Sequence, residues 1–190
     1  MASVYLAAFP ESVQHFFGRR PPNPQAVADL LTIPLLAEPG CGCVAVAGEA
    51  VVGYCLAPAH ISRLPRALWR GRLARMLWRW LMGRYDLGLD AALRLARNHA
   101  IGSRRDPHHV EAHILSLAVH PARQGEGLGR ALLQRGLDYL QEQGAGRVRL
   151  EVRPDNTGAL RLYESAGFAT VGRTRDAQGD WLIMTREAQP

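Results

Sequence analysis

The feature that most constrains this chain is a glycine-rich turn between a predicted strand and a predicted helix. Its residues run Gln124-Gly125-Glu126-Gly127-Leu128-Gly129-Arg130. Glycines at such a turn let backbone N–H groups point into one space, because no Cβ atoms obstruct them. The N-terminus of the following helix adds unpaired N–H donors and a partial positive charge. The segment therefore predicts a binding site for a phosphate or pyrophosphate group.

Two common nucleotide-binding loops do not fit this turn. The dinucleotide fingerprint G-x-G-x-x-G belongs near the start of a Rossmann unit. Here its third glycine position holds Arg130, and the turn comes late in the chain. A Walker loop needs a lysine before Ser or Thr, yet all 23 basic residues of this chain are arginine. The pyrophosphate should therefore belong to another kind of nucleotide.

Strands and helices alternate around the turn. The preceding strand, 113–119, ends at His120-Pro121 because proline cannot donate to a sheet ladder. The following helix, 127–143, is indicated by leucines at helical spacing. The other predicted elements of this half are strands over 147–153, 168–174 and 181–187, a helix over 157–166 that Gly167 ends, and a hairpin loop over 176–180.

Helices are predicted to open the chain. The first covers about 3–17, and the second runs from Pro24 to about residue 37 with Asn23 as its cap. Apolar runs over 43–47 and 51–57 flank a Gly48-Glu49-Ala50 turn, which is typical of a β-hairpin.

A helical insert rich in Arg and Trp is predicted over about 62–100. Its first helix covers 65–82, its second covers 86–99, and a polar loop follows over 104–109. We expect one side of the first helix to pack on the sheet and the other to face water. The apolar side comprises Trp69, Leu73, Met76, Leu77 and Trp80, and the polar side Arg72, Arg75 and Arg79. One alternative is a lid that shapes the acceptor site or holds an acidic substrate. Another is a helix that lies on a membrane surface.

The ordered motifs of the second half resemble the GNAT N-acetyltransferase superfamily over residues 116–173. That family carries Gln/Arg-x-x-Gly-x-Gly/Ala after a strand that ends near Val-x-Pro. This chain has Val119-His120-Pro121, followed by Gln124-x-x-Gly127-x-Gly129. The family continues with a strand, an Asn and a Leu-Tyr-x-x-x-Gly-Phe run, as at Asn156 and Leu162-Tyr163-Glu164-Ser165-Ala166-Gly167-Phe168. Within the family, this region resembles ribosomal-protein alanine acetyltransferases.

The resemblance implies an α/β (α+β) fold with a mixed, mostly antiparallel central sheet flanked by helices, and with the helical insert before the cofactor-binding strand. The sheet should splay where the strands ending near Val119 and Arg153 part, and the whole chain, 1–190, should be one domain. Acetyl-CoA is the implied co-substrate, with no metal, and its pantetheine arm should enter that gap. The implied cofactor-binding residues are Leu117, Ala118, Val119, Gln124, Gly125, Glu126, Gly127, Leu128, Gly129, Arg130 and Asn156.

The resemblance also implies catalytic roles. Tyr163 should protonate the leaving thiolate, and a base should remove a proton from the attacking amine, since most amines are protonated at neutral pH. Glu151 lies 12 residues before Tyr163, as does the proposed base of ribosomal-protein alanine acetyltransferases. His113 lies six residues before Val119, where arylalkylamine acetyltransferases carry a His or Glu, and histidine suits proton removal. Both residues are candidates; a solvated row of charges on one strand face is the alternative reading of Glu151.

Composition argues against several other classes of protein. No apolar run approaches the roughly 20 residues that a membrane span needs. Three cysteines without zinc-site spacing predict a reduced, cytoplasmic protein. The net charge is +6, but residues 60–105 hold eleven arginines against Asp86 and Asp90, so the rest of the chain is net acidic. Such a local concentration of charge argues against general nucleic-acid binding.

The sequence therefore predicts an N-acetyltransferase that modifies a protein N-terminus, a lysine side chain or a small amine. A CoA-binding sensor or interaction module without turnover is the alternative. Acceptor specificity in this family comes from the first helices and from inserts, and these parts of the chain carry no recognisable motif. A homodimer is left open.

Overall fold

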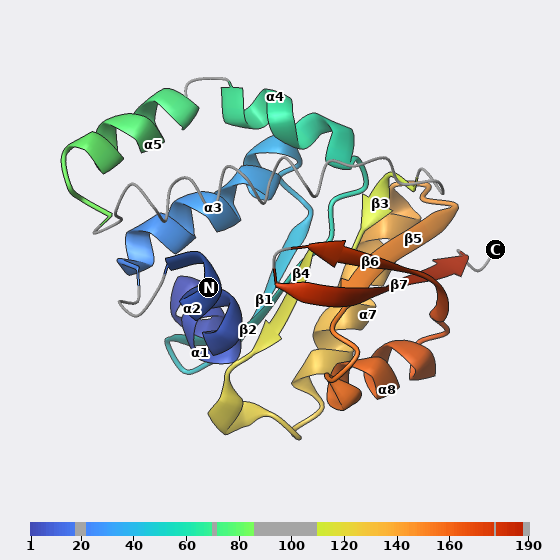
Figure 1. Ribbon diagram of the computed structural model, residues 1–190. Helices are drawn as coiled ribbons and strands as arrows, with labels where there is room; N and C mark the ends of the chain where they lie inside the picture. Colours follow the sequence, from blue (N-terminus) through green and yellow to red (C-terminus); the bar gives the residue numbers. More distant parts are fainter. Residues whose placement is uncertain (18–21, 70–71, 86–109, 177, 188–190) are drawn as a thin grey trace.

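Seven strands in two sheets form the centre of the protein (Figure 1). The computed structural model describes residues 1–17, 22–69, 72–85, 110–176 and 178–187. One sheet has the order β1 (Gly42–Ala47), β2 (Ala50–Leu56), β4 (Ser116–Val119); the other has the order β3 (Ala112–His113), β5 (Arg147–Val152), β7 (Gly179–Glu187), β6 (Ala169–Asp176). All pairs are antiparallel except β3 with β5. Helices flank these sheets, which confirms the predicted fold class.

The strand predicted over 113–119 is in fact two strands on different sheets. The Ile114 N–H donates to the Arg149 carbonyl of β5 at 2.9 Å. The next amide, Leu115 N–H, donates to the Leu56 carbonyl of β2 at 2.8 Å. Beyond this point β4 pairs with β2 and β5 pairs with β7, so the two sheets diverge. The splayed sheet that the resemblance implies is therefore present.

The helix predicted over 3–17 is also two helices, α1 (Ala2–Ala8) and α2 (Pro10–Phe17). The break falls at Phe9, whose φ and ψ are −124° and 55°. Proline disfavours the helical conformation at the residue before it, so Pro10 ends α1. The next helix, α3 (Pro24–Ala37), is as predicted, and the Asn23 side chain accepts a hydrogen bond from the Gln25 N–H at 2.9 Å.

The remaining elements of both halves follow the predictions closely. The first hairpin joins β1 and β2, and the glycine turn leads into α7 (Leu128–Glu142). Helix α8 (Thr157–Ser165) ends before Gly167, whose φ of 86° suits glycine. The last hairpin is tighter than predicted, because Asp176 of β6 pairs with Gly179 of β7.

The described part of the insert begins with a short 3₁₀ turn, η1 (Ile61–Arg63). Two helices follow it, α4 (Leu64–Trp69) and α5 (Arg72–Leu81). The single helix predicted over 65–82 is therefore wrong. The helix predicted over 86–99 and the loop over 104–109 lie outside the described residues. None of the described helices is long and apolar enough to cross a membrane.

The expected orientation of the first insert helix is also wrong. Arg79 does not face water: its guanidinium lies 2.6 Å from the carboxylate of Asp29 on α3, which is only 6% exposed. The Tyr85 hydroxyl donates to the same carboxylate. Burial alone would raise the pKa of Asp29, but the hydrogen bonds from Tyr85, Arg79 and Gln25 lower it. A buried carboxylate needs such partners, so the arginine face of α5 turns toward α3.

The main core lies between α7 and the strands. Leu133 and Leu140 of α7 are buried in one cluster with Cys55 of β2 and Met184 of β7. Gly136 lets the helix approach β2 closely, since a Cβ atom there would lie 2.9 Å from the Cys55 sulfur and 3.2 Å from the Ala57 Cβ. This contact holds α7, and therefore the turn at its N-terminus, against the first sheet.

We predict that Gly136→Ala lowers the free energy of unfolding by about 1–3 kcal/mol, because the added methyl group overpacks this contact. The matched control is Gly158→Ala in α8, where the added Cβ would have only the Asn156 Oδ1 atom within 4 Å, at 3.9 Å. That control should be neutral, or stabilising by up to about 1 kcal/mol, because alanine favours helix. Urea unfolding measures both changes, and equal effects at the two positions would contradict the close packing of α7 on β2.

Candidate active site

The two sheets open a gap between β4 and β5, and β4 is the edge strand on its side of the gap (Figure 1). The His120 N–H donates to the Val52 carbonyl of β2 at 2.8 Å. Backbone groups alternate sides along a paired strand, so those of Leu117 and Val119 point away from β2. The open edge therefore offers N–H and C=O groups to an extended ligand, in the way an added strand would use them.

The glycine turn follows β4 directly and has the backbone that an anion site needs. Gly125 and Gly127 have φ angles of 85° and 79°, a region that other residues adopt at a cost. A Cβ atom at either position would meet nothing within 4 Å, so the requirement for glycine is conformational. Gly127 caps α7 without a side-chain hydrogen bond, so the first N–H groups of the helix remain available to a ligand.

Three side chains of the turn hold its shape. Gln124 donates from Nε2 to the Val119 carbonyl at 3.2 Å and ties the turn to the end of β4. Glu126 pairs with Arg123 at 2.7 Å. Arg130 donates to the Ser165 hydroxyl of α8 at 3.1 Å. In this arrangement the backbone of the turn, rather than the side chains of Glu126 and Arg130, is free to meet an anion.

A pocket of about 330 Å³ joins the open strand to the turn. Most of the predicted cofactor-binding residues line it, namely Leu117, Ala118, Val119, Gln124, Gly125, Leu128, Gly129 and Asn156. Glu126, Gly127 and Arg130 are not among its lining residues. Asn156 also caps α8, because its Oδ1 accepts a hydrogen bond from the Ala159 N–H at 3.1 Å. The residues predicted from the turn and from β4 are therefore brought together in one groove.

A second cleft of about 750 Å³ adjoins this pocket. The two share the residues Ala8, Phe9, Leu117, Asn156, Ala159 and Tyr163. Tyr163 is 8% exposed and packs edge-on against Phe168, with ring centroids 5.9 Å apart. Burial, and to a smaller extent the Cys55 thiol, raises the pKa of the Tyr163 phenol. Tyr163 therefore lies where the two cavities meet and keeps its proton at neutral pH.

The two candidate bases differ in their relation to this cleft. Glu151 lines it together with Tyr163, and its side chain is 44% exposed. The Arg149 guanidinium, with a side chain only 9% exposed, lies 2.7 Å from the Glu151 carboxylate. The alternative reading of this strand face as a solvated row of charges is therefore wrong at Arg149, because that residue is buried. His113 pairs in register with Arg149 and is not a lining residue of either cavity.

The walls of the second cleft come from residues that the sequence did not single out. On one side α1 and α2 contribute Tyr5, Glu11 and His15. On the other side Trp181 lies beneath the Arg153 guanidinium, which is 5.6 Å from the ring centroid. No local pattern marks these residues, and only the family's use of its first helices for specificity pointed to this region.

Three carboxylates line the cleft, and two of them are paired with arginine: Glu151 with Arg149 at 2.7 Å and Asp155 with Arg153 at 3.6 Å. Glu11, Glu151 and Asp155 line it, against Arg153 as the one arginine among its described lining residues. Arg153 is engaged by Trp181, and it also donates to the Gln178 carbonyl at 2.5 Å. In the described part of the chain, no group of three or more His, Cys, Asp or Glu residues could hold a metal ion.

A family model described as the acetyltransferase (GNAT) family matches residues 6–168 of this chain. The chain is 45% identical over 80 residues to the [Ribosomal protein bS18]-alanine N-acetyltransferase of Escherichia coli (strain K12), which covers 39% of this chain and 54% of that protein. It is 47% identical over 72 residues to the N-alpha-acetyltransferase RimI of Mycobacterium tuberculosis (strain ATCC 25618 / H37Rv), which covers 38% of this chain and 42% of that protein. The chain thus spans about half the length of these curated relatives.

The fold is similar to that of solved structures over nearly the whole chain. A crystal structure of SsHAT superposes with a TM-score of 0.69 and 22% sequence identity. The alignment covers 99% of this chain and 93% of that one. At this level of identity the likeness concerns the fold.

Proposed function

This chain belongs to the GNAT acetyltransferase family, and on that premise we propose that it transfers an acetyl group from acetyl-CoA to a primary amine. One observation supports this most strongly: the open edge of β4, the glycine turn and Tyr163 share a single groove. An extended thioester arm with a pyrophosphate at one end matches an unpaired strand edge that leads to an anion-binding helix N-terminus.

In this proposal the backbone carries most of the cofactor binding. Leu117 and Val119 pair with the amides of the pantetheine arm, and the N–H groups from Gln124 to Gly129 hold the pyrophosphate. Asn156 lies beside the arm in the same pocket. A backbone N–H of the strand near Val119 also donates to the oxyanion that forms when the amine attacks the thioester, a position where a preoriented donor lowers the barrier.

The proposed reaction is a direct transfer. A base takes one proton from the ammonium, and the free amine nitrogen bonds to the acetyl carbon. The nitrogen then loses its second proton to solvent as the carbon–sulfur bond breaks, which leaves the neutral amide. Tyr163 donates its phenolic proton to the leaving sulfur and recovers one from solvent. The raised pKa of Tyr163 keeps the phenol protonated until the thiolate forms.

Glu151 is the base that the geometry favours. Its carboxylate lies in the cleft that Tyr163 also lines, so one substrate can reach both groups directly or through a water molecule. Arg149 orients it from a buried position. His113 is the second candidate; because it lies outside the lining of both cavities, it would need a bridging molecule.

A protein N-terminus is the acceptor that we propose. Two relatives are named as N-acetyltransferases of a ribosomal protein's alanine and of an α-amino group. The 750 Å³ cleft is large enough for several residues of a peptide. Two of its carboxylates complement a positively charged terminus: Glu11, which has no arginine partner among the described residues, and Glu151, the proposed base. A CoA-binding module without turnover remains the alternative, and it would need none of these carboxylates.

The turn offers a test of cofactor binding that separates affinity from folding. We predict that Gly127→Ala raises the Kd for acetyl-CoA about tenfold, because alanine at this positive φ costs about 1–2 kcal/mol and moves the N–H groups. The matched control is Gly144→Ala at the other end of α7, where φ is 76° and a Cβ atom would also meet nothing within 4 Å. Calorimetric titration with acetyl-CoA measures both variants. Equal effects on Kd would contradict the assignment of the pyrophosphate to this turn.

The chemistry is tested by removing single functional atoms. With an alanine-initiated peptide as acceptor, we predict that Tyr163→Phe and Glu151→Gln each lower kcat by about 100-fold or more, the usual effect of losing a general acid or base. The Kd for acetyl-CoA should change little.

His113→Gln and Tyr139→Phe are the controls for this experiment. Tyr139 lies on α7, where its hydroxyl donates to Glu38 at 2.7 Å, so its variant reports the general cost of losing a tyrosine hydroxyl. If His113→Gln lowers kcat by about 100-fold and Glu151→Gln does not, His113 is the base. If acetyl-CoA binds while no peptide, lysine or small amine is acetylated, the module without turnover is the correct reading.

A further inference from the structure

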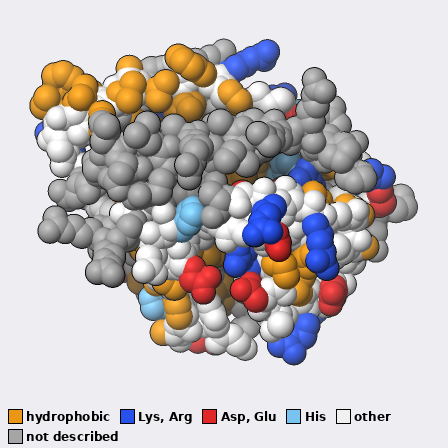
Figure 2. Space-filling model, in the orientation of Figure 1, with side chains coloured by type: hydrophobic (Ala, Val, Ile, Leu, Met, Phe, Trp, Pro, Cys, Tyr) orange, Lys and Arg blue, Asp and Glu red, His pale blue; other side chains and the backbone are white. Residues whose placement is uncertain are grey.

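The helices α4 and α5 expose an unusual number of large apolar side chains. Neither helix contains a buried residue. Figure 2 shows hydrophobic side chains gathered along the upper edge of the molecule, over these two helices. The exposed group, called here the Trp/Leu face, consists of Trp69 (73% exposed), Leu77 (49%), Trp78 (62%), Leu81 (67%) and Met82 (55%). Large apolar surfaces of this kind mark interaction sites.

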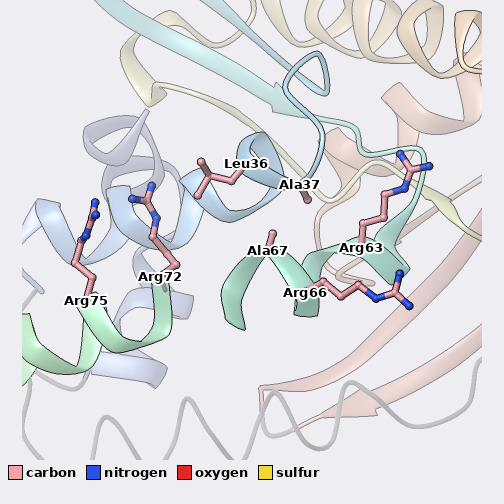
Figure 3. A pocket seen from close by; sticks show the side chains of 7 residues that line it. All are labelled: Leu36, Ala37, Arg63, Arg66, Ala67, Arg72 and Arg75. Atoms are coloured by element: carbon pink, nitrogen blue, oxygen red, sulfur yellow. The ribbon is translucent and has the colours of Figure 1, made fainter. Parts of the chain in front are cut away.

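The opposite face of α5 fixes the helix to the body of the protein through its arginines. Arg79 pairs with the buried Asp29 of α3. Arg72 and Arg75 line a cleft of about 620 Å³ beside Leu36 and Ala37 at the end of α3. Figure 3 shows these two arginines at one end of that cleft and Arg63 and Arg66 at the other. The Trp/Leu face is therefore turned away from α3 by contacts that the structure describes.

The same segment carries only positive charge. Residues 61–85 contain seven arginines and no aspartate or glutamate. Arg66, Arg72 and Arg75 have no carboxylate partner among the described residues, and the buried Nε of Arg72 has no hydrogen-bond partner there. The insert therefore carries unneutralised guanidinium groups, and those of Arg66 and Arg75 belong to exposed residues.

We propose that α4 and α5 bind the interface of an anionic phospholipid bilayer. Tryptophan and leucine on one face of a helix, with arginine on the other, is the composition of helices that lie in the membrane interface. The ten residues of α5 span about 15 Å, half the thickness of a bilayer core, so the helix lies in the plane of the membrane. The arginines bind the lipid phosphates, for which guanidinium groups are well suited.

Charge also distinguishes this occupant from a second copy of the chain. Two copies that met through the Trp/Leu face would bring two sets of unpaired arginines together without any acidic residue of the segment between them. A bilayer with negative headgroups removes that repulsion. Among the described residues, the cleft beside α4 and α5 shares no lining residue with the two cavities of the candidate active site, so this interaction does not rest on the proposed function.

The test is sedimentation of the full chain with vesicles of phosphatidylcholine alone and of phosphatidylcholine with about one third phosphatidylglycerol, an anionic lipid. We expect binding to the anionic vesicles that falls as salt concentration rises, and little binding to phosphatidylcholine. The double variant Trp78→Glu/Leu81→Glu should lower the partition coefficient by about tenfold or more, because it removes the inserted side chains. Arg66→Gln/Arg75→Gln should lower it roughly fivefold per arginine.

Val46→Glu is the matched control, since Val46 is 63% exposed on β1 and its variant should bind anionic vesicles like the original chain. Circular dichroism and thermal unfolding establish that each variant is folded. The proposal is overturned if the original chain does not bind anionic vesicles, or if the Trp78→Glu/Leu81→Glu variant binds them equally well. It is also overturned if this variant instead abolishes a concentration-dependent dimer, which would assign the face to a second copy.

Discussion

Two consecutive backbone hydrogen bonds decide the architecture of this protein. The amide of Ile114 donates to β5, and the amide of Leu115 donates to β2. A chain whose neighbouring residues join different sheets must leave a gap beyond that point, because β4 can no longer pair with β5. The unpaired edge of β4, the pocket at its end and the glycine turn that follows all depend on this division. The first turn of α7 is in place because Gly136 lets the helix pack on β2.

The parts of the site that could be predicted from sequence are those coded by local residues. The glycines at 125 and 127, the cap at Asn156 and the end of α8 at Gly167 each need a specific residue at a specific backbone angle or terminus, so motif and structure agree. The break before Pro10 was missed, although proline constrains the residue that precedes it. The split at Ile114 and Leu115 could not be predicted, because both residues are apolar and only their distant partners differ.

The insert illustrates a second limit of sequence reasoning. Helical periodicity identified an apolar side and an arginine side on α5, but it could not say which one meets the body of the protein. Asp29, about 50 residues earlier, decides this: its buried carboxylate binds Arg79 and Tyr85, and Leu77, Trp78 and Leu81 are left exposed. Likewise, the sequence could not choose between Glu151 and His113, because they differ in their position relative to a cleft whose residues come from α1, α2, β4, β5, α8 and β7.

Hydrogen exchange at single amides, measured by NMR with and without CoA, tests most directly the claim that the open edge of β4 holds the pantetheine arm. The account predicts that the amides of Leu117 and Val119 gain protection when CoA binds, while the Ala118 amide, which faces β2, changes little. CoA binding that slows exchange only in the turn and in the first residues of α7, with Leu117 and Val119 unchanged, would contradict it.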